Sequence, residues 1–216
     1  MFSSTKGIFL RIVSGVIPLD HDKISLIIGL GNPGSEYEKT RHNAGKWFID
    51  RLCELYKTSL SFEKKFHGFT GSMTEAGKKI QLLFPTTFMN KSGLSIAMMC
   101  QFYQIPHTSI LVIHDELDIP AGHIRLKIGG GNGGHNGLKS TTESLGNQPQ
   151  FIRLRIGIGH PGDRSKVSDY VLSKPGEKDK ILIDQSIERG ALQIKDIIMG
   201  NLNDVMDRLH RENPSL

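Results

Sequence analysis

The sequence comprises 216 residues, which is enough to bury one sizeable hydrophobic core. Apolar residues make up 38% of it, and no apolar stretch approaches the ~20 residues that span a bilayer, which argues against a membrane protein. The formal net charge of +5 is a mild basic excess that suits a nucleic-acid partner without requiring one. Its two cysteines, Cys53 and Cys100, lack the spacing of a disulfide or zinc framework and indicate a reducing, cytoplasmic compartment.

Residues 1–22 differ from the rest of the chain. Lys6 precedes an apolar run, as in a secretory signal, but Arg11 interrupts this run and no small-residue cleavage site follows. We therefore expect residues 1–22 to be a poorly ordered N-terminal extension or the product of an upstream translation start. Residues 23–216 are expected to form a single α/β hydrolase domain with a helical C-terminal part.

The remaining chain alternates between strand-like and helix-like segments. Continuous apolar runs predict strands that are buried on both faces, and apolar side chains at helical spacing predict amphipathic helices. The first half predicts a strand at 23–28, a helix at 43–56, a hairpin with strands at 69–74 and 79–84, a helix at 92–103 and a strand at 110–114. The second half predicts a strand at 123–128, a helix from 136 to 146, a strand at 151–158 and a mostly helical C-terminal part. This order predicts an α/β fold with a twisted mixed β-sheet flanked by helices on both faces.

A glycine-rich turn follows the first strand. Its sequence, Gly29-Leu30-Gly31-Asn32-Pro33-Gly34, matches the G-x-G-x-x-G pattern of dinucleotide-binding folds, in which the third glycine already lies in a helix. Here Pro33 disfavours helical backbone at Asn32, and helical spacing begins only near Asn43. The acidic residue that should end a second strand about 20 positions later is also missing. We therefore expect no dinucleotide, and we interpret the glycines as residues that let the backbone turn and approach a bound group closely.

A second glycine-rich stretch at residues 129–134 precedes His135-Asn136 at a predicted helix start. A phosphate-binding P-loop requires Gly-Lys-Ser/Thr in sequence, whereas here Leu138 separates Gly137 from Lys139. We therefore exclude a nucleoside triphosphate and interpret the stretch as a binding loop.

Five side chains of the metal-ligand type could converge: His42, His114, Asp115, Glu116 and His135. The sequence nevertheless contains neither an H-E-x-x-H pattern nor paired cysteines. The polar segments around these side chains are rich in asparagine, which is a poor ligand for a catalytic metal but both donates and accepts hydrogen bonds. We therefore expect neither a metal nor another cofactor.

His42 and Asp115 are the candidates for acid–base chemistry. An unperturbed histidine has a pKa of ~6.5 and is the natural base near neutral pH. A carboxylate that bonds to one ring nitrogen fixes the tautomer and stabilises the imidazolium as it forms. Because the sequence offers no activated serine or cysteine, the nucleophile would be water.

Basic residues gather at i, i+2 spacing on two predicted strands. Arg125 with Lys127, and Arg153 with Arg155, should each share one face of a strand. Either these pairs form an ordinary solvated sheet face, or, next to a glycine loop, they form a surface that contacts phosphate. The neighbouring glycine loop favours the second interpretation.

Several separate blocks together resemble the bacterial-type peptidyl-tRNA hydrolase family. They are GLGNPGSEYEKTRHNAG, FPTTFMNKSG, HDELDIPAG, GGGNGGHNGLKS and FIRLRIGIGHPGDRSKVSDYVLSKP, in the order of the family. The resemblance covers about residues 24 to 175, and we expect it to include the helical tail. It implies a monomeric, metal-free α/β esterase that cleaves the ester between a peptide and the terminal ribose of tRNA. Its partners would be the tRNA acceptor end and the attached peptide.

The resemblance also implies roles for particular residues. His42 matches the general base, Asp115 matches the carboxylate that supports it, and Asn32 matches the position that recognises a blocked amino group. Lys127 and Arg155 match a basic pair that clamps tRNA phosphate. Asn90 and Asn136 match positions suited to hold water or the oxyanion. The remaining matched substrate or cleft positions are Tyr37, Phe88, Met89 and His135. An alternative is a non-catalytic RNA-binding protein on the same scaffold.

Overall fold

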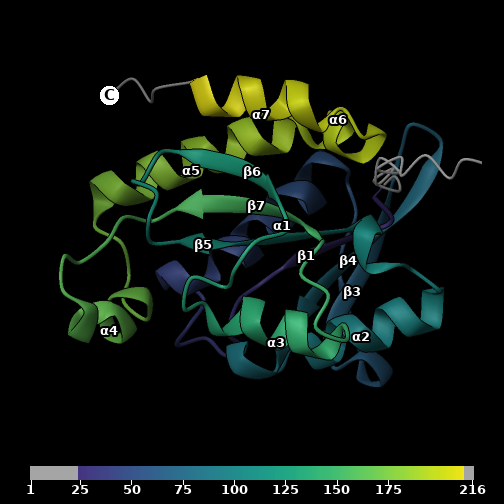
Figure 1. Cartoon of the computed structure of the whole chain (residues 1–216), viewed down its shortest axis with the longest axis horizontal. Helices are drawn as coiled ribbons and strands as arrows, with labels where there is room; N and C mark the ends of the chain where they lie inside the picture. Colours follow the sequence, from purple (N-terminus) through teal and green to yellow (C-terminus); the bar gives the residue numbers. More distant parts are fainter. Residues whose placement is uncertain (1–23, 212–216) are drawn as a thin grey trace, which may run out of the picture.

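A computed structural model describes residues 24–211 of the chain, and the expected extension at residues 1–22 lies outside this range. Within the described range, seven strands form one mixed sheet in the order β2-β3-β4-β1-β5-β7-β6. The central strands β4, β1, β5 and β7 run parallel to one another, while β2, β3 and β6 are antiparallel to their neighbours. The twisted sheet lies between two helical layers, as Figure 1 shows. The predicted mixed α/β fold is therefore confirmed.

The strands of the described range are β1 (Leu26–Gly29), β2 (Ser61–Glu63), β3 (Gly68–Glu75), β4 (Lys78–Pro85), β5 (Ile110–Glu116), β6 (Ile124–Ile128) and β7 (Ile152–Gly157). Its helices are α1 (Ala44–Leu55), α2 (Ser92–Tyr103), α3 (Asn136–Ser144), α4 (Val167–Val171), α5 (Glu177–Leu192), α6 (Ile194–Met199) and α7 (Leu202–Arg211). Short 3-10 turns precede three of these helices, at Arg41–Asn43, Met89–Lys91 and Arg164–Lys166.

The central strands divide their side chains between two hydrophobic cores. Successive residues of a strand point to opposite faces. In β1, Ile27 joins the core beneath α1, α5, α6 and α7, whereas Leu26 and Ile28 join the core beneath α2 and α3. All three side chains are fully buried, which explains why this run is continuously apolar rather than alternating.

The helix α1 lies unusually close to β1, because both elements have glycine at their contact. A Cβ atom on Gly29 would come within 2.3 Å of the Gly45 carbonyl oxygen, and one on Gly45 within 2.6 Å of the Leu30 amide nitrogen. The Gly31 backbone similarly packs against the side chain of Asn43. The expectation that these glycines admit a bound group is therefore corrected at Gly29. The lack of a side chain at Gly29 serves the packing of α1 against β1.

The sequence-based elements agree with most of the observed ones. The helix at 92–103 matches α2 residue for residue, and the hairpin is confirmed with strands that are longer by one residue at each end. The predicted strand at 110–114 extends to Glu116, so Asp115 is itself a residue of the strand. The strand β2 was not predicted, because it has three residues and pairs only at the edge of the sheet.

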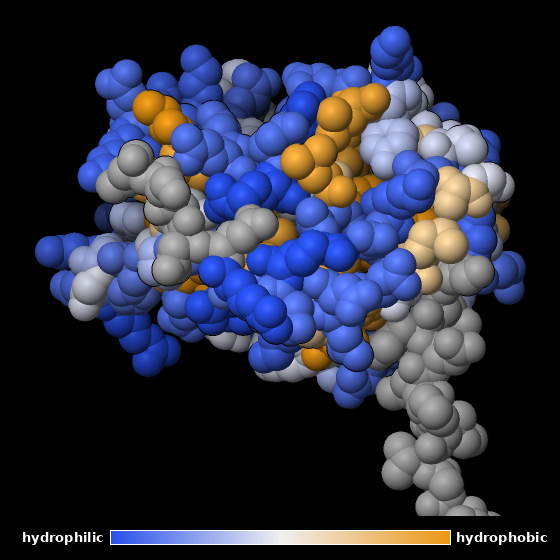
Figure 2. Space-filling model, turned by 90° about the horizontal axis from the view of Figure 1, so that it is seen from above, coloured by the Kyte–Doolittle hydropathy of each residue, from blue (hydrophilic) through white to orange (hydrophobic). Residues whose placement is uncertain are grey.

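The outer surface of the C-terminal helices is mostly hydrophilic. Figure 2 views the molecule from the side of α5, α6 and α7 and shows separate hydrophobic patches in a polar surface. In α7, Leu202, Val205 and Leu209 are buried against the core. Among the described helices, none is both long and apolar enough to cross a membrane.

Candidate active site

A cleft of about 1050 Å³ opens at the carboxyl ends of the parallel strands. The β7 arrowhead and α4 mark this end at the left of Figure 1. Ligand sites in α/β sheets favour this position, because loops that leave neighbouring strands bring their side chains together there. Nine of the sequence-predicted site residues line the cleft: Asn32, Tyr37, His42, Phe88, Met89, Asn90, Asp115, His135 and Asn136.

His42 and Asp115 are brought into direct contact in this cleft. His42 lies in the 3-10 turn before α1, and Asp115 is the penultimate residue of β5. The Nδ1 atom of His42 is 2.9 Å from Oδ1 and 3.0 Å from Oδ2 of Asp115. Because an ionised carboxylate only accepts hydrogen bonds, this contact places the proton of a neutral His42 on Nδ1 and leaves its Nε2 as an acceptor. No described residue bonds to Nε2.

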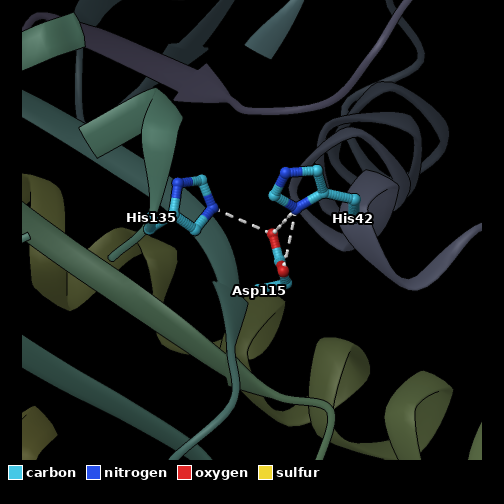
Figure 3. Close-up of side chains that lie close together, drawn as sticks. All are labelled: His42, Asp115 and His135. Atoms are coloured by element: carbon cyan, nitrogen blue, oxygen red, sulfur yellow. Dashed lines mark hydrogen bonds and ion pairs between the residues drawn. The ribbon is translucent and has the colours of Figure 1, made fainter. Parts of the chain in front are cut away.

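A second histidine, His135, holds the same carboxylate from the opposite side. Its Nε2 atom is 3.0 Å from Asp115 Oδ1, and Figure 3 shows the carboxylate between the two imidazole rings. The Nδ1 atom of His135 accepts the backbone N–H groups of Gly137 and Leu138, so that His135 caps the N-terminus of α3. These bonds assign the proton of His135 to Nε2. The sequence placed His135 in the cleft but did not predict its contact with Asp115.

Burial and mutual charge set the protonation states of this cluster. Burial alone would raise the pKa of Asp115, but His42 and His135 hold it well below its usual range. Burial would likewise lower the pKa of His42, yet the charge of Asp115 and the hydrogen bonds to it raise this pKa above its ordinary value. The neighbouring His114 is fully enclosed, and burial together with His135 lowers its pKa to about 3. His114 is therefore a neutral structural residue, and its Nδ1 donates to the Asp115 carbonyl oxygen.

His42, Asp115 and His135 are also residues of the metal-ligand type, and their candidate ligand atoms lie within 4.8 Å of one another. Both ring nitrogens that face the carboxylate donate hydrogen bonds to it, so neither offers a lone pair there. If the proton of His135 moved to Nδ1, it would face the backbone N–H groups of Gly137 and Leu138, and these two hydrogen bonds would be lost. The hydrogen bonding thus favours acid–base chemistry over metal binding.

Asn32 is held in place by Asn43, the first residue after His42. The Asn43 side chain accepts the Asn32 backbone N–H at 2.8 Å and donates to the Asn32 carbonyl oxygen at 3.0 Å. The Asn32 side chain in turn accepts the Met89 backbone N–H through Oδ1, at 2.8 Å. Its Nδ2 group donates to no residue within 24–211 and is available to a ligand in the cleft. The sequence did not predict this role of Asn43. The signal that could have indicated it is the position of this polar residue directly after His42.

Tyr37 and Phe88 form the aromatic rim of the cleft. Their rings meet edge to face with centroids 6.3 Å apart, and the Phe88 side chain is largely exposed. The amide side chains of Asn90 and Asn136 come from the turn before α2 and from the first residue of α3. Both are exposed and line the cleft, and their amides are therefore available to a bound molecule.

The helix α4 supplies a wall of the cleft that the sequence did not predict. His160, Arg164 and Leu172 line this wall together with Val167, Ser168 and Val171. Arg41, the residue before His42, holds the segment that follows α4. The Arg41 guanidinium donates to Ser173 Oγ at 2.8 Å and to the Lys174 carbonyl oxygen at 2.9 Å. The sequence signal for this wall was the glycine- and proline-containing segment at residues 159–162, which precedes a short amphipathic segment.

Lys127 and Arg155 lie outside the cleft, on the sheet face that β6 and β7 form beside it. Arg125 stands directly opposite Arg155 across the two antiparallel strands, and Lys127 stands opposite Arg153. The predicted shared face of these pairs is therefore confirmed. Arg153 differs from the other three because it is buried and donates to the carbonyl oxygens of residues 130 and 131. It supports the glycine loop and is not available to phosphate.

Comparisons with known proteins agree on one family. The model of the family described as peptidyl-tRNA hydrolase matches residues 26–215. The peptidyl-tRNA hydrolase of Pectobacterium atrosepticum is 53% identical over 187 residues, which cover 87% of this chain and 96% of that protein. The crystal structure of peptidyl-tRNA hydrolase from Acinetobacter baumannii superposes with a TM-score of 0.87 at 45% identity, over 90% of this chain and 98% of that one. The chain therefore belongs to the peptidyl-tRNA hydrolase family.

Proposed function

We propose that this member of the peptidyl-tRNA hydrolase family cleaves its ester substrate with a water molecule that His42 activates. The observation that carries the proposal is the bond between His42 Nδ1 and Asp115, because it leaves the basic Nε2 atom as an acceptor on a residue that lines the cleft. A general base has to lie in the site where the substrate binds, in the correct tautomer, and with a pKa near the working pH. His42 satisfies the first two conditions, and the pKa raised by Asp115 keeps it a strong proton acceptor.

The proposed reaction has two proton transfers. His42 Nε2 removes a proton from water, and the oxygen of that water forms a bond to the ester carbonyl carbon. Asp115 stabilises the imidazolium that results. The tetrahedral intermediate collapses as the bond to the ribose oxygen breaks, and the imidazolium returns its proton to this leaving oxygen. The products are a peptide carboxylic acid and a tRNA with a free terminal ribose.

Neutral amides are suited to the charge that develops on the carbonyl oxygen. We assign Asn90 and Asn136 to hold the attacking water and the oxyanion, because both line the cleft with exposed side chains. An amide donates hydrogen bonds without a charge that would compete for the proton on His42.

The substrate is held at two separate surfaces in this proposal. The Nδ2 group of Asn32 donates to the acyl oxygen on the blocked amino group, while Tyr37 and Phe88 pack against the aminoacyl group. His135 and Met89 close the cleft around the ester. Lys127 and Arg155 contact backbone phosphates of the tRNA acceptor end outside the cleft.

We propose that residues 23–216 act as one domain, as a monomer, in the cytoplasm, where aborted translation supplies the substrate. The two free cysteines, Cys53 and the buried Cys100, suit a reducing compartment. The family comparisons support the hydrolase and give no support to the alternative of a non-catalytic RNA-binding protein.

The experiment follows released tRNA from N-acetyl-aminoacyl-tRNA and from free aminoacyl-tRNA. The wild-type protein is expected to hydrolyse the blocked substrate, and His42→Ala is expected to lose roughly 10²–10⁴-fold in kcat, the range for a general base. His107→Ala is a matched control, because His107 lies in a separate 3-10 turn and does not line the cleft. Unchanged hydrolysis in His42→Ala would contradict the assignment.

The same assay in the presence of a chelator tests the absence of a metal. The proposal expects unchanged kcat, because both cluster nitrogens that face Asp115 are occupied by protons. Loss of activity in chelator, restored by a divalent cation, would replace the proposed base by a metal-bound water. Binding of the blocked substrate without release of tRNA would instead favour the RNA-binding alternative.

A further inference from the structure

Arg125 and Lys127 of β6, together with Arg153 and Arg155 of β7, form a basic face beside the cleft. This basic face brings like charges close together. Arg125 and Arg155 are directly opposed across β6 and β7, as are Lys127 and Arg153. Like charges in directly opposed positions destabilise a sheet, so a face of this kind needs an anion nearby. In the described part of the chain, the carboxylate that forms a hydrogen bond with this face is that of Glu116, the last residue of β5, and its partner is Arg155.

Glu116 binds Arg155 in a particular way. Its Oε2 atom accepts the Nε–H of Arg155 at 3.0 Å, and the two side chains are 16% and 22% exposed. Its other oxygen, Oε1, accepts the backbone N–H of Asp118 at 3.2 Å, which holds the carboxylate itself in place. The remaining Nη1 and Nη2 groups of Arg155 donate to no residue within 24–211. Glu116 therefore occupies one edge of the guanidinium and leaves the two terminal groups for another acceptor.

The comparison with Arg153 shows that this arrangement is not a general property of the face. Both terminal nitrogens of Arg153 are used inside the protein, at 2.6 and 2.7 Å from carbonyl oxygens of the glycine loop. Two parallel N–H groups of an arginine match two oxygens of a phosphate, provided that the side chain is held in the right orientation. Of the two arginines on β7, only Arg155 presents such a pair.

We propose that Glu116 is a positioning residue for tRNA binding: it fixes the Nε edge of Arg155 so that Nη1 and Nη2 together contact one backbone phosphate. The proposal rests on the proposed phosphate contact of Arg155. It also links the two substrate surfaces, because Glu116 lines the cleft and follows Asp115 directly in β5. The residue that orients the phosphate-binding guanidinium of Arg155 thus lies on the same strand as the carboxylate of the catalytic pair.

The test compares Glu116→Gln with Glu116→Ala. Both variants remove the same negative charge, so the general electrostatic effect on tRNA binding is equal in the two. Glutamine keeps an oxygen that accepts the Arg155 Nε–H, whereas alanine does not. We expect the Kd for uncharged tRNA to be about fivefold higher for the alanine variant than for the glutamine variant, the effect of one lost hydrogen bond. In hydrolysis of N-acetyl-aminoacyl-tRNA, the difference between them should fall on KM rather than kcat.

Arg155→Ala in the same titration separates this inference from the phosphate contact on which it rests. If Arg155→Ala weakens binding while the two Glu116 variants bind equally, the contact stands and the positioning role is overturned. If Arg155→Ala has no effect, the phosphate contact itself is wrong and no role for Glu116 remains. The fivefold difference should also vanish when both Glu116 variants carry Arg155→Ala.

Glu143→Ala is the control for the loss of a carboxylate. Glu143 lies on α3 with a side chain that is 60% exposed and pairs with Lys139, not with Arg155. It should bind tRNA as tightly as the wild type or slightly more tightly. If Glu143→Ala weakened binding as strongly as Glu116→Ala, the effect would not come from the orientation of Arg155, and the proposal would fail.

Discussion

The cleft and the basic face hold their charges in opposite ways. In the cleft, Asp115 is 3% exposed and is bonded by imidazole rings on both sides. On the basic face, Arg125 and Lys127 are exposed to solvent and stand opposite other cations. Buried charges interact strongly because water does not screen them, whereas exposed charges are weakened by salt.

This difference predicts that the cleft contributes mainly to the chemical step and the basic face mainly to tRNA binding. A buried, hydrogen-bonded pair keeps its geometry before the substrate arrives, so its contribution is expected in the chemical step. An exposed cationic face attracts the polyanionic tRNA at long range and contributes to affinity and association rate. Substitutions in the cleft should therefore change kcat and its pH dependence, and substitutions on the face should change Kd and its salt dependence.

The largest effect in this comparison is expected from Asp115→Asn. The amide retains the shape of the carboxylate but removes its charge, so that the imidazolium of His42 loses its stabilisation. We expect kcat to fall by about 10²–10⁴-fold, as for loss of the base or of its orientation. The affinity for uncharged tRNA should remain unchanged. A large loss of tRNA affinity would contradict the separate contributions of the cleft to kcat and of the basic face to tRNA binding.

The pH dependence of the same variant has a defined sign. His42 accepts a proton only when it is neutral, so activity rises as the pH passes its pKa. Asp115 raises the pKa of His42 in the wild type, against the lowering effect of burial. Removal of the charge leaves burial as the dominant influence, and the acidic limb of the residual activity should move to lower pH. A limb that stays in place would show that Asp115 does not set the pKa of the base.

A smaller effect is expected at His135, which has two separable contacts. His135→Ala removes the cap of α3 and the bond to Asp115, whereas His135→Asn supplies a good capping side chain that is too short to reach Asp115. The alanine variant should lose about 0.5–2 kcal/mol in the free energy of unfolding. Both variants should lose about tenfold in kcat, the effect of one charge-assisted hydrogen bond. If asparagine restored kcat together with stability, the bond to Asp115 would have no role in the reaction.

Most of the fold follows from local patterns in the sequence. The buried parallel strands are continuous apolar runs, and α2 is bounded on its C-terminal side by Pro106, so both could be predicted without tertiary information. The edge strand β2 carries no such pattern, because its side chains are exposed or half-buried. The packing role of Gly29 was also hidden, since it depends on Gly45, which lies 16 residues later and on a different element.

The candidate site could be predicted in its members but not in its contacts. The polar segments at strand ends pointed to His42 and Asp115, and the resemblance to a family supplied the other cleft residues. The second imidazole on Asp115 could not be predicted, because nothing in the chain spacing shows that the cap of α3 lies beside the end of β5. Arg153 was grouped with the phosphate-binding residues by its spacing, yet its partners are loop carbonyls that approach only in the folded protein.

The smallest effect is expected on the exposed face, from Lys127→Ala. Its side chain donates no hydrogen bond to another residue in the range 24–211, so its loss should leave the free energy of unfolding almost unchanged. If it contacts one phosphate, the slope of log Kd against log salt should fall by roughly one unit, because one fewer counterion is released on binding. His42→Ala is the matched comparison from the cleft and should leave this slope as it is. An equal slope in the wild type and Lys127→Ala would remove Lys127 from the contact with tRNA, and the affinity of the basic face would then have to come from Arg125 and Arg155.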